Sequence, residues 1–584
     1  MTTLPPPVQD SVPLVPPQST ASARPDAHTQ KYDRQLRLWA SAGQTALENA
    51  NILVVNANST ATSTLKNLVL PGIGNFSLLD PELVKAQDLG TNFFLEPSSI
   101  GQPRAEQAVK YLCELNADVK GTAIVSSLSE FLASSPSALE PYTLILAVDV
   151  APPSEVSELT EKAWQAGIPL IKVESFGFYG ALSTQIEEIC LVETHPESLI
   201  DLRLNAPFPE LIQFAQSEFD YSTMDSAQHS HVPAVVILVK ALEVWKSLHE
   251  GRGPEGSQER KEFLELVSKE KRKGSDEENF DEAVGLYRRA GTKRAIPSEI
   301  EKLFSDDSCR NLTSQSANFW VLLHTLERFT QHPSNPSHLL PLTGSLPDMK
   351  AHSTTYVKLQ QIYRSKAKAD LDLFQQLLSE TLASLAQSGG SGSTREIARE
   401  ELESFVKHSA WVKVLRGRKL NESVEPATSL LQGKIGELLE QASWSSPPDQ
   451  SLSIYLALVT SSRFYSLHSR YPGSLTAQQG DVDGTKDVDE MVKIGQTLLK
   501  ELAHDGGDDL PGPFDKAIKE LSSLTTICRN SCRSSHSTLP QTAALLGGLV
   551  AQETIKLVTK QYVPLVGETC IWDGITSMTG RVRA

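Results

Sequence analysis

Two arginines, Arg34 and Arg37, lie three positions apart in the segment KYDRQLRLW, among apolar residues with helical spacing. Tyr32, Leu36 and Trp39 would share one face of a helix, and the two guanidinium groups would project from another. A guanidinium group can donate paired hydrogen bonds to phosphate or carboxylate oxygens. The pattern therefore has two interpretations. The arginines form part of an ordinary solvent-exposed face, or the helix docks on the protein and presents a cation to a ligand.

The stretch NILVVNANSTATSTLKNLVLPGIGNFSLLD, residues 51–80, has the order strand, loop, helix, strand. Residues 52–55 and 76–79 are apolar runs typical of buried parallel strands, and residues 64–70 predict a helix between them. In a nucleotide-binding unit of this kind, the first loop is rich in glycine and an acid roughly 20 positions on holds the ribose. Asp80 stands where that acid is expected.

The first loop of this unit does not suit a phosphate. Asn56, Asn58 and Ala61 occupy the places of the three glycines. Asn tolerates left-handed backbone and Ala is accepted at the third place, so the turn can still form. However, the side chains of Asn56, Asn58 and Ser59 would crowd the space that a pyrophosphate needs. The sequence therefore predicts a nucleotide-binding architecture whose phosphate site is filled in.

Strands and helices alternate through residues 51–175. A helix is predicted over residues 99–116 and buried strands over residues 142–149 and 168–173, the first of them ending on Asp149. This alternation indicates a doubly wound, mostly parallel α/β sheet, in which a ligand site lies at the carboxyl ends of the strands.

Changes in composition and hydrophobic periodicity divide the chain into four parts. Residues 1–29 are rich in Pro and Ser without the apolar core of a secretory signal, and we expect a disordered tail. Residues 30–175 would form the first part of the sheet domain, and residues 176–530 a mainly helical insertion. Residues 531–584 would complete the sheet domain, through a helix of small residues at 540–559 and short strands after it.

Composition excludes some classes of function. The 584 residues carry a formal net charge of −17, which argues against a general nucleic-acid binder and suits basic protein partners or simple solubility. No apolar run approaches the roughly 18 residues that span a membrane. Six scattered cysteines lack the spacing of a disulfide framework, which favours a reducing compartment: the cytoplasm, the nucleus or both.

The cysteines offer little chemistry of their own. A nucleophilic cysteine needs a lowered pKa and access, yet Cys190 follows two glutamates and the others lie in apolar or helical segments. Cys528, Cys532 and His536 could share one helix face as metal ligands, but no fourth ligand is evident. We therefore expect no metal site.

The histidines of HSHVP, His229 and His231, are interpreted as structural residues rather than ligands. The segment would cap a helix that begins near Pro233.

Several segments together resemble the activating enzymes of ubiquitin-like modifiers, in the ThiF-like superfamily. More narrowly they are similar to the regulatory subunits of heterodimeric neddylation activating enzymes. These segments are KYDRQLRLW, KNLVLPGIG, NFFLEPSSIG, DLRLNAPFPEL, HSHVP, GSLPDM, RYPG and GGLVAQETIK. The resemblance runs from about residue 30 to the C-terminus, and the combination is specific to this family.

Catalytic members of the family adenylate the modifier's C-terminal glycine with ATP and Mg²⁺. By the resemblance, Asp80 matches their ribose acid, Arg104 replaces their phosphate Lys, and Asp149 matches their metal-binding Asp, although Val150 follows it instead of Asn. The segment TNFF at 91–94 stands where NRQF would supply a phosphate Arg. The resemblance therefore implies an inactive adenylation half that binds no cofactor productively, with an insertion that lacks the catalytic cysteine.

The resemblance gives Arg34 a use. In this family the N-terminal helix of the inactive half extends an Arg to the γ-phosphate in the active half, and Arg34 matches that Arg. The implied partners are the catalytic subunit, which uses ATP and Mg²⁺, the ubiquitin-like modifier and the conjugating enzyme, with neither nucleic acid nor membrane. The chain would not be catalytic alone.

Two alternatives stay open. One is an independent ATP-dependent adenylating enzyme of the ThiF-like superfamily with an unusual phosphate loop. The other is a dinucleotide-dependent oxidoreductase. The lost loop glycines count against both, and the missing Arg and Cys count further against the first.

Overall fold

A computed structural model describes most of the chain between residues 26 and 583. The ranges inside these limits that it does not describe are 195–199, 273–275, 291–295, 389–394, 421–448, 474–483, 504–526 and 528–538. Most of the predicted N-terminal tail lies outside the described residues, and so does the candidate metal set Cys528, Cys532 and His536.

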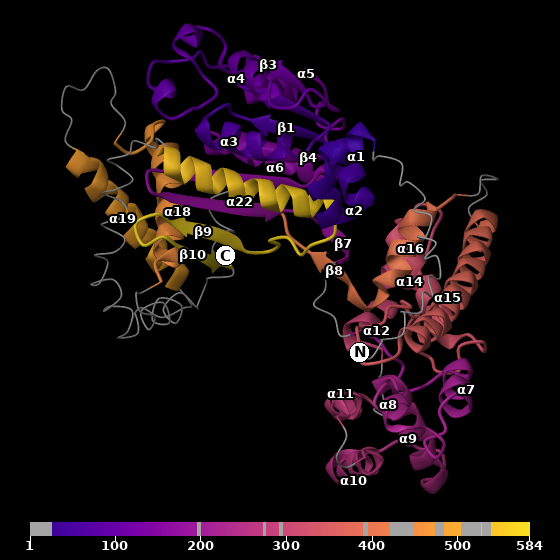
Figure 1. The fold of residues 1–584 in the computed structure, drawn as a ribbon. Helices are drawn as coiled ribbons and strands as arrows, with labels where there is room; N and C mark the ends of the chain where they lie inside the picture. Colours follow the sequence, from indigo (N-terminus) through magenta and orange to yellow (C-terminus); the bar gives the residue numbers. More distant parts are fainter. Residues whose placement is uncertain are drawn as a thin grey trace, which may run out of the picture.

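An eight-stranded sheet in the order β10-β9-β6-β5-β4-β1-β2-β3 forms the body of the molecule (Figure 1). Five neighbouring strands are parallel: β1 (Asn51–Val55), β2 (Asn75–Leu79), β3 (Lys120–Ile124), β4 (Leu144–Val148) and β5 (Leu170–Phe176). The other three pair antiparallel: β6 (Tyr179–Gln185), β9 (Thr569–Asp573) and β10 (Met578–Val582). Because β1 lies between β2 and β4, the strand order reverses there, at the point where such sheets bind ligands. The predicted doubly wound, mostly parallel sheet is confirmed.

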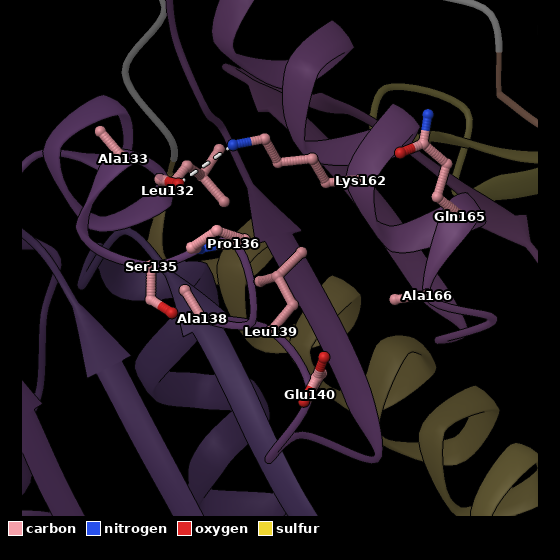
Figure 2. A pocket seen from close by; sticks show the side chains of 10 residues that line it. All are labelled: Leu132, Ala133, Ser135, Pro136, Ala138, Leu139, Glu140, Lys162, Gln165 and Ala166. Carbon is pink, nitrogen blue, oxygen red and sulfur yellow. Dashed lines mark hydrogen bonds between the residues drawn. The ribbon is translucent and has the colours of Figure 1, made fainter.

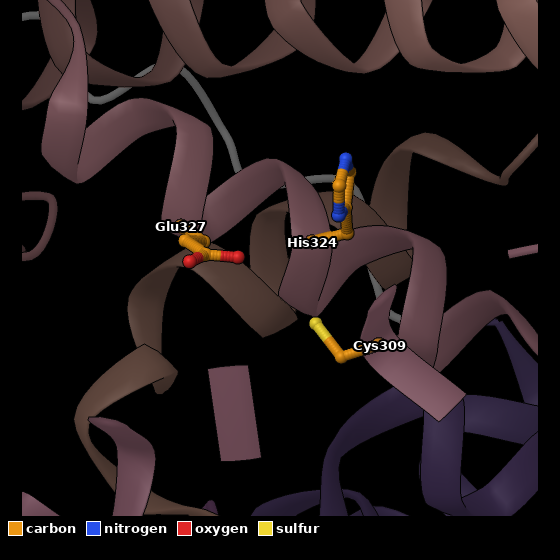
Figure 3. Close-up of side chains that lie close together, drawn as sticks. All are labelled: Cys309, His324 and Glu327. Carbon is orange, nitrogen blue, oxygen red and sulfur yellow. The ribbon is translucent and has the colours of Figure 1, made fainter. Parts of the chain in front are cut away.

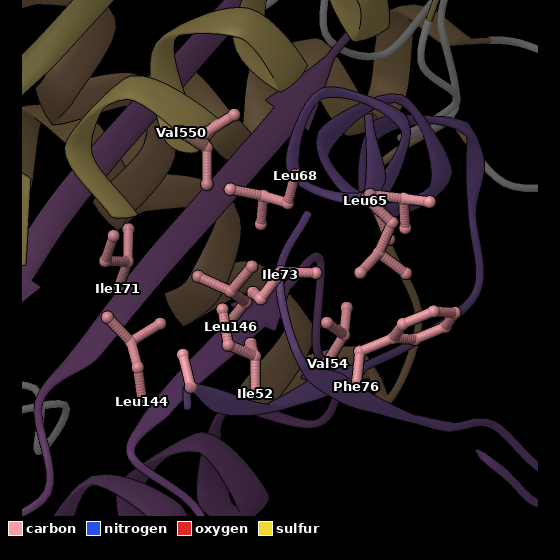
Figure 4. Close-up of a cluster of buried hydrophobic side chains, with 14 of the residues drawn as sticks. Ile52, Val54, Leu65, Leu68, Ile73, Phe76, Leu144, Leu146, Ile171 and Val550 are labelled. Carbon is pink, nitrogen blue, oxygen red and sulfur yellow. The ribbon is translucent and has the colours of Figure 1, made fainter. Parts of the chain in front are cut away.

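Helices cover both faces of the parallel strands. Ile52 and Val54 of β1 belong to one buried cluster, together with Leu65, Leu68 and Val550 from the covering helices (Figure 4). The alternate residues of β1 belong to a second buried cluster on the other face. A strand buried on both faces reads as an unbroken apolar run, which is why the sequence revealed it. The helices of this part are α1 (Ala27–Lys31), α2 (Asp33–Glu48), α3 (Ser59–Val69), α4 (Arg104–Cys113), α5 (Leu128–Ser134), α6 (Pro153–Gln165) and α22 (Pro540–Thr559).

The small-residue helix α22 lies against α3, and its observed bounds are those predicted. A Cβ atom at Gly547 would stand 2.6 Å from the Ser63 side chain and 2.9 Å from the Thr64 backbone nitrogen. The absence of a side chain at this position therefore lets the two helices approach closely. Through α22, the last segment of the chain packs beside the first strands of the sheet domain and completes that domain.

A second group of helices lies apart from the sheet, joined to it by the two-stranded ribbon β7 (Glu188–Val192) and β8 (Val412–Arg416) (Figure 1). Its helices are α7 (Pro209–Ser217), α8 (Ser226–His229), α9 (Ala234–Leu248), α10 (Gly256–Lys269), α11 (Glu278–Leu286), α12 (Ser298–Phe304), α13 (Asp307–Arg310), α14 (Asn318–Gln331), α15 (Ser353–Ser388) and α16 (Arg399–Lys407). We call this group the helical lobe. Short 3₁₀ turns occupy Asp88–Gly90, Pro97–Ser99, Tyr287–Arg289 and Ser409–Trp411.

The domain boundaries differ from those predicted. The boundary at 175 falls inside β5, and β6 continues the same sheet to residue 185. Two later helices, α18 (Ser451–His468) and α19 (Gly484–Ala503), share a buried cluster with Tyr179 and Ile571 of the sheet rather than with the helical lobe. The strand β6 was not predicted from the sequence, because its small and polar residues break the apolar run that marks a buried strand.

Two predicted helices also differ in detail. The helix predicted over 99–116 is shorter: Pro103 precedes its first residue, and Ser99 ends a separate 3₁₀ turn with a capping box to Glu96. The N-terminal helix is broken at Trp39 and Ala40, where Ala40 has φ +54°. No helix in the described ranges is both long enough and apolar enough to cross a bilayer.

Candidate functional site

Asp80, the predicted ribose acid, directly follows β2 and is only 1% exposed. Its Oδ2 accepts hydrogen bonds from Arg104 Nε at 2.6 Å and from the Ala57 backbone N–H at 2.8 Å. Its Oδ1 accepts from the Glu82 backbone N–H at 2.8 Å. Arg104 donates through Nη2 to Asn56 Oδ1 at 2.9 Å. Both carboxylate oxygens are thus engaged, and the cation at the predicted phosphate position is directed at the acid.

Asp149, the predicted metal-binding acid, follows β4 with φ +48°. Its Oδ1 accepts from the Ser175 backbone N–H at 2.5 Å, and its Oδ2 accepts from Ser175 Oγ and Asn58 Nδ2, each at 2.6 Å. Burial raises the pKa of the Asp149 carboxyl to about 6, although the hydrogen bonds from Ser175 and Asn58 oppose the shift. Three internal hydrogen bonds therefore occupy the oxygens that a metal ion would need.

The loop between β1 and α3 joins these two acids. Asn56 has φ +79°, the left-handed backbone that a glycine would otherwise supply, and its side-chain amide donates to the Asp149 carbonyl at 3.2 Å. Asn58 caps α3 by accepting from the Ala61 N–H at 3.0 Å. The structure thus brings Asn56, Asn58, Asp80, Arg104 and Asp149 together at the carboxyl ends of the strands. We call this set the recess.

Two further residues, Asn92 and Ser175, support the recess, and the sequence did not predict their roles. Asn92 is 3% exposed, donates to the Ala57 carbonyl at 3.2 Å, and accepts from Thr62 Oγ1 at 3.0 Å. Ser175 supplies two of the three hydrogen bonds to Asp149. A signal for Ser175 did exist, because a serine inside a buried strand needs a polar partner. For Asn92, the resemblance places the segment 91–94 at the phosphate position, but only as the place of a missing Arg, and it assigns Asn92 no role.

Arg34 lies near the amino-terminal ends of the strands, opposite the recess at their carboxyl ends. Tyr32, two residues before it, is 2% exposed and its hydroxyl donates to Asp118 Oδ2 at 3.0 Å and accepts from Asn116 Nδ2 at 3.1 Å. Both partners precede β3, and the Tyr32 ring also packs against Gly72, which precedes β2. The segment is therefore anchored at the amino ends of the strands. The five residues of β2 span roughly 16 Å, so Arg34 cannot reach the recess of its own chain.

Two of the three residues predicted for the docking face, Tyr32 and Trp39, are buried, and the third, Leu36, is half-buried. The Trp39 indole donates to Gln44 Oε1 at 3.1 Å, and Gln561 donates to the Trp39 carbonyl at 2.9 Å. Between these anchors, the exposed Arg37 pairs with Asp33 at 3.1 Å. Arg34 is also exposed, and no described residue forms a hydrogen bond or ion pair with its side chain.

The comparisons with known proteins agree with this layout. A model of the ThiF family matches residues 32–584. The NEDD8-activating enzyme E1 regulatory subunit of Xenopus laevis is 36% identical over 541 residues, covering 91% of this chain and 95% of that protein. The chain belongs to the ThiF family, among the NEDD8-activating enzyme E1 regulatory subunits. The protein of the same name from Gallus gallus is 36% identical over 553 residues, covering 94% and 96% of the two chains. The regulatory subunit AXL of Arabidopsis thaliana is 34% identical over 547 residues, covering 93% and 97%.

Three thiols in the described part of this ThiF-family chain are poorly suited to nucleophilic attack. Burial and the Glu188 carboxylate raise the pKa of Cys190 to about 12. Burial likewise raises the pKa of Cys309 to about 12, and it raises that of Cys570 as well. A thiol with a raised pKa is protonated at neutral pH and is a weak nucleophile.

The histidines of HSHVP lie inside the helical lobe. His229 is buried, with Nδ1 2.6 Å from Glu277 Oε1, and His231 stacks on His352 at 4.4 Å between ring centroids. The predicted helix start is confirmed, since Pro233 is the N-cap residue of α9. No side chain of the segment caps that helix, however, and the capping box belongs to Asp225 at the start of α8. The two histidines therefore pack the lobe rather than cap α9.

A surface pocket of about 570 Å³ lies beside α5 and α6 of the ThiF-family sheet (Figure 2). Leu132, Leu139 and Lys162 line it, and none of the predicted site residues does. The Lys162 ammonium donates to the Leu132 carbonyl at 3.0 Å and pairs with Glu158 at 3.1 Å. The cation of this pocket is thus already satisfied, and the pocket does not compete with the recess as a nucleotide site.

Proposed function

We propose that this chain is the regulatory subunit of a heterodimeric NEDD8-activating enzyme, acting in the cytoplasm, the nucleus or both. The catalytic partner would bind ATP and Mg²⁺, adenylate the C-terminal glycine of the ubiquitin-like modifier, and carry it as a thioester to a conjugating enzyme. This chain would hold the complex together and place Arg34 in the partner's ATP site. The names of its relatives support the regulatory role.

The observation that carries the proposal is the position of Arg34. It is exposed at the amino edge of the sheet, on a segment fixed by two buried aromatic anchors. Its own recess lies at the carboxyl edge, beyond the reach of its side chain. A guanidinium on an anchored segment, with no partner among the residues that the structure describes, suits an anion on another molecule.

The recess supports the assignment of ATP to the partner. A ribose would have to displace Arg104 or a backbone N–H from Asp80, and a metal ion would have to displace Ser175 or Asn58 from Asp149. Each displacement leaves a buried polar group without its partner, which costs about 1–3 kcal/mol. The alternative of an independent adenylating enzyme requires several of these losses together.

The role proposed for Arg34 is electrostatic. Adenylation breaks the bond between the α- and β-phosphates, and negative charge grows on the departing pyrophosphate. A preorganised donor aimed at that charge stabilises the transition state by about 2.7–4 kcal/mol, which corresponds to a rate effect of about 10²–10³. The two anchors matter because a flexible arginine would have to be ordered at the moment of reaction.

The test is modifier-dependent ATP–pyrophosphate exchange by the complex of this chain with its catalytic partner. Arg34→Ala should lower the exchange rate about 10²–10³-fold, whereas Arg37→Ala is the matched control and should stay within about twofold, because it removes only a surface pair. Assembly of each complex is checked by gel filtration. If Arg34→Ala exchanges as fast as Arg37→Ala, the role in trans is wrong.

A further inference from the structure

Three side chains that could bind a metal ion converge inside the helical lobe. Cys309 lies on α13, while His324 and Glu327 lie three residues apart on α14 and so share one side of that helix (Figure 3). The thiol sulfur, one imidazole nitrogen and one carboxylate oxygen all lie within 4.8 Å of one another. We call these residues the Cys309 cluster.

One atom of the cluster has no partner. His324 Nδ1 is buried, and no described group forms a hydrogen bond with it. Leaving a buried polar atom unsatisfied costs about 1–3 kcal/mol, so such atoms in folded proteins usually have a ligand or a water. The Cys309 side chain is 0% exposed and also lies in the packed interior. One buried nitrogen of the cluster, His324 Nδ1, therefore lacks a partner that a bound ion could supply.

The charges around the thiol favour a cation. The carboxylates of Glu327 and Asp306 lie near the Cys309 sulfur, and the guanidinium of Arg310 is the cation near it among the described residues. Two acids against one base leave negative surroundings that would attract a divalent cation. When such an ion binds, the thiol proton passes to solvent.

We propose that Cys309, His324 and Glu327 bind a zinc ion that links α13 to α14. Thiolate, imidazole and carboxylate are all established zinc ligands, and a mixed set of sulfur and nitrogen donors disfavours Mg²⁺ and Ca²⁺. Around a tetrahedral zinc ion, neighbouring donors stand about 3.5 Å apart. The separation of any two donors therefore needs to shrink by about 1.3 Å at most, which small rotations of both side chains supply. The fourth position is left for a water molecule.

The sequence could not reveal this site. Structural zinc sites are found through paired cysteines or histidines at short spacing. Here the only local element is a His and a Glu at i and i+3 on one helix, and the cysteine comes from a separate short helix.

The experiment uses the full chain after dialysis against a chelator. Co²⁺ is added as a spectroscopic substitute for Zn²⁺, followed by competition with Zn²⁺. The inference predicts one Co²⁺ per chain, with thiolate-to-cobalt charge-transfer absorption that Zn²⁺ abolishes. Glu327→Gln, which keeps the shape of the side chain, should weaken Zn²⁺ binding at least about tenfold, and Cys309→Ser should remove the charge-transfer band.

The matched control is Cys190→Ser. Cys190 is a half-buried thiol beside a carboxylate, but its carboxylate neighbour is Glu188 and it is not part of the Cys309 cluster. It should leave both the band and the Zn²⁺ affinity unchanged. Folding of each variant is checked by circular dichroism, and Glu327→Gln keeps the test valid if Cys309→Ser fails to fold. The inference is overturned if wild-type protein gives no thiolate band, or if Glu327→Gln binds Zn²⁺ as tightly as wild type.

Discussion

Two arginines at opposite edges of one sheet have opposite surroundings. Arg104, at the carboxyl edge, is 13% exposed by its side chain and bonds to Asp80 and Asn56. Arg34, at the amino edge, is exposed and has no partner among the described residues. The surroundings of a cation indicate its role: Arg104 is held by an acid and an amide of its own chain, whereas Arg34 is available to a second molecule.

The difference predicts different consequences of mutation. Changes in the recess should alter the stability of this chain, because its groups satisfy one another. Changes at Arg34 should leave stability unchanged and alter only an activity of the complex.

Arg104→Ala should destabilise the sheet domain by about 3–5 kcal/mol, because it leaves the Asp80 carboxylate buried without its cation. Hydrogen exchange of the β1 and β2 amides, followed by mass spectrometry, measures the loss locally. The matched control is Lys85→Ala, which breaks the exposed pair with Glu82 at 2.5 Å and should change stability by less than about 1 kcal/mol.

A double variant distinguishes the effect of the unpaired Asp80 charge from the effect of losing the Arg104 side chain. Asp80→Asn combined with Arg104→Ala should recover part of the loss, because no buried charge then lacks a partner. Equal destabilisation by Arg104→Ala and Lys85→Ala would show that the recess is solvated rather than closed.

The carboxyl of Asp149 should make stability depend on pH. Its pKa in the folded chain is about 6, above the ordinary 3.8, so folding favours the protonated form. The stabilisation this group gives is complete below pH 4 and is lost as the pH rises through 6, by up to about 3 kcal/mol. Wild type should therefore lose stability relative to Asp149→Asn between pH 4 and 6. Thermal unfolding at steps of pH measures the difference, and parallel curves would contradict it.

Gly547→Ala should destabilise the chain by about 1–3 kcal/mol, because the added methyl meets the backbone of α3 just after the recess loop. The neighbouring Gly548 is the control: nothing lies within 4 Å of its missing Cβ, so Gly548→Ala should stabilise α22 by about 0.5–1 kcal/mol. The melting temperature reports both. Shifts of the same sign would mean that α22 and α3 are not in close contact.

Much of the fold was predictable because strands buried on both faces leave unbroken apolar runs, as in β1, β2 and β4. The small-residue helix α22 was equally clear. The strands β3 and β6 were missed, since partial exposure in one and small polar residues in the other remove that signal. The break at Ala40 also left no trace, because alanine is normally a strong helix former.

The recess was only partly predictable. Asp80 and Asp149 end strands, so spacing placed them at one edge of the sheet. The pairing of Arg104 with Asp80, and the support from Asn92 and Ser175, depend on side-chain directions between distant segments. Spacing along the chain does not encode those directions.

The central claim is that this chain binds no ATP productively itself and completes a site in its partner. Modifier-dependent ATP–pyrophosphate exchange tests it most directly, with this chain alone, the catalytic partner alone, and the two mixed. We predict strong exchange only in the mixture. Exchange by this chain alone would contradict the account, because it would mean that the asparagine-rich loop holds phosphate and that the recess opens.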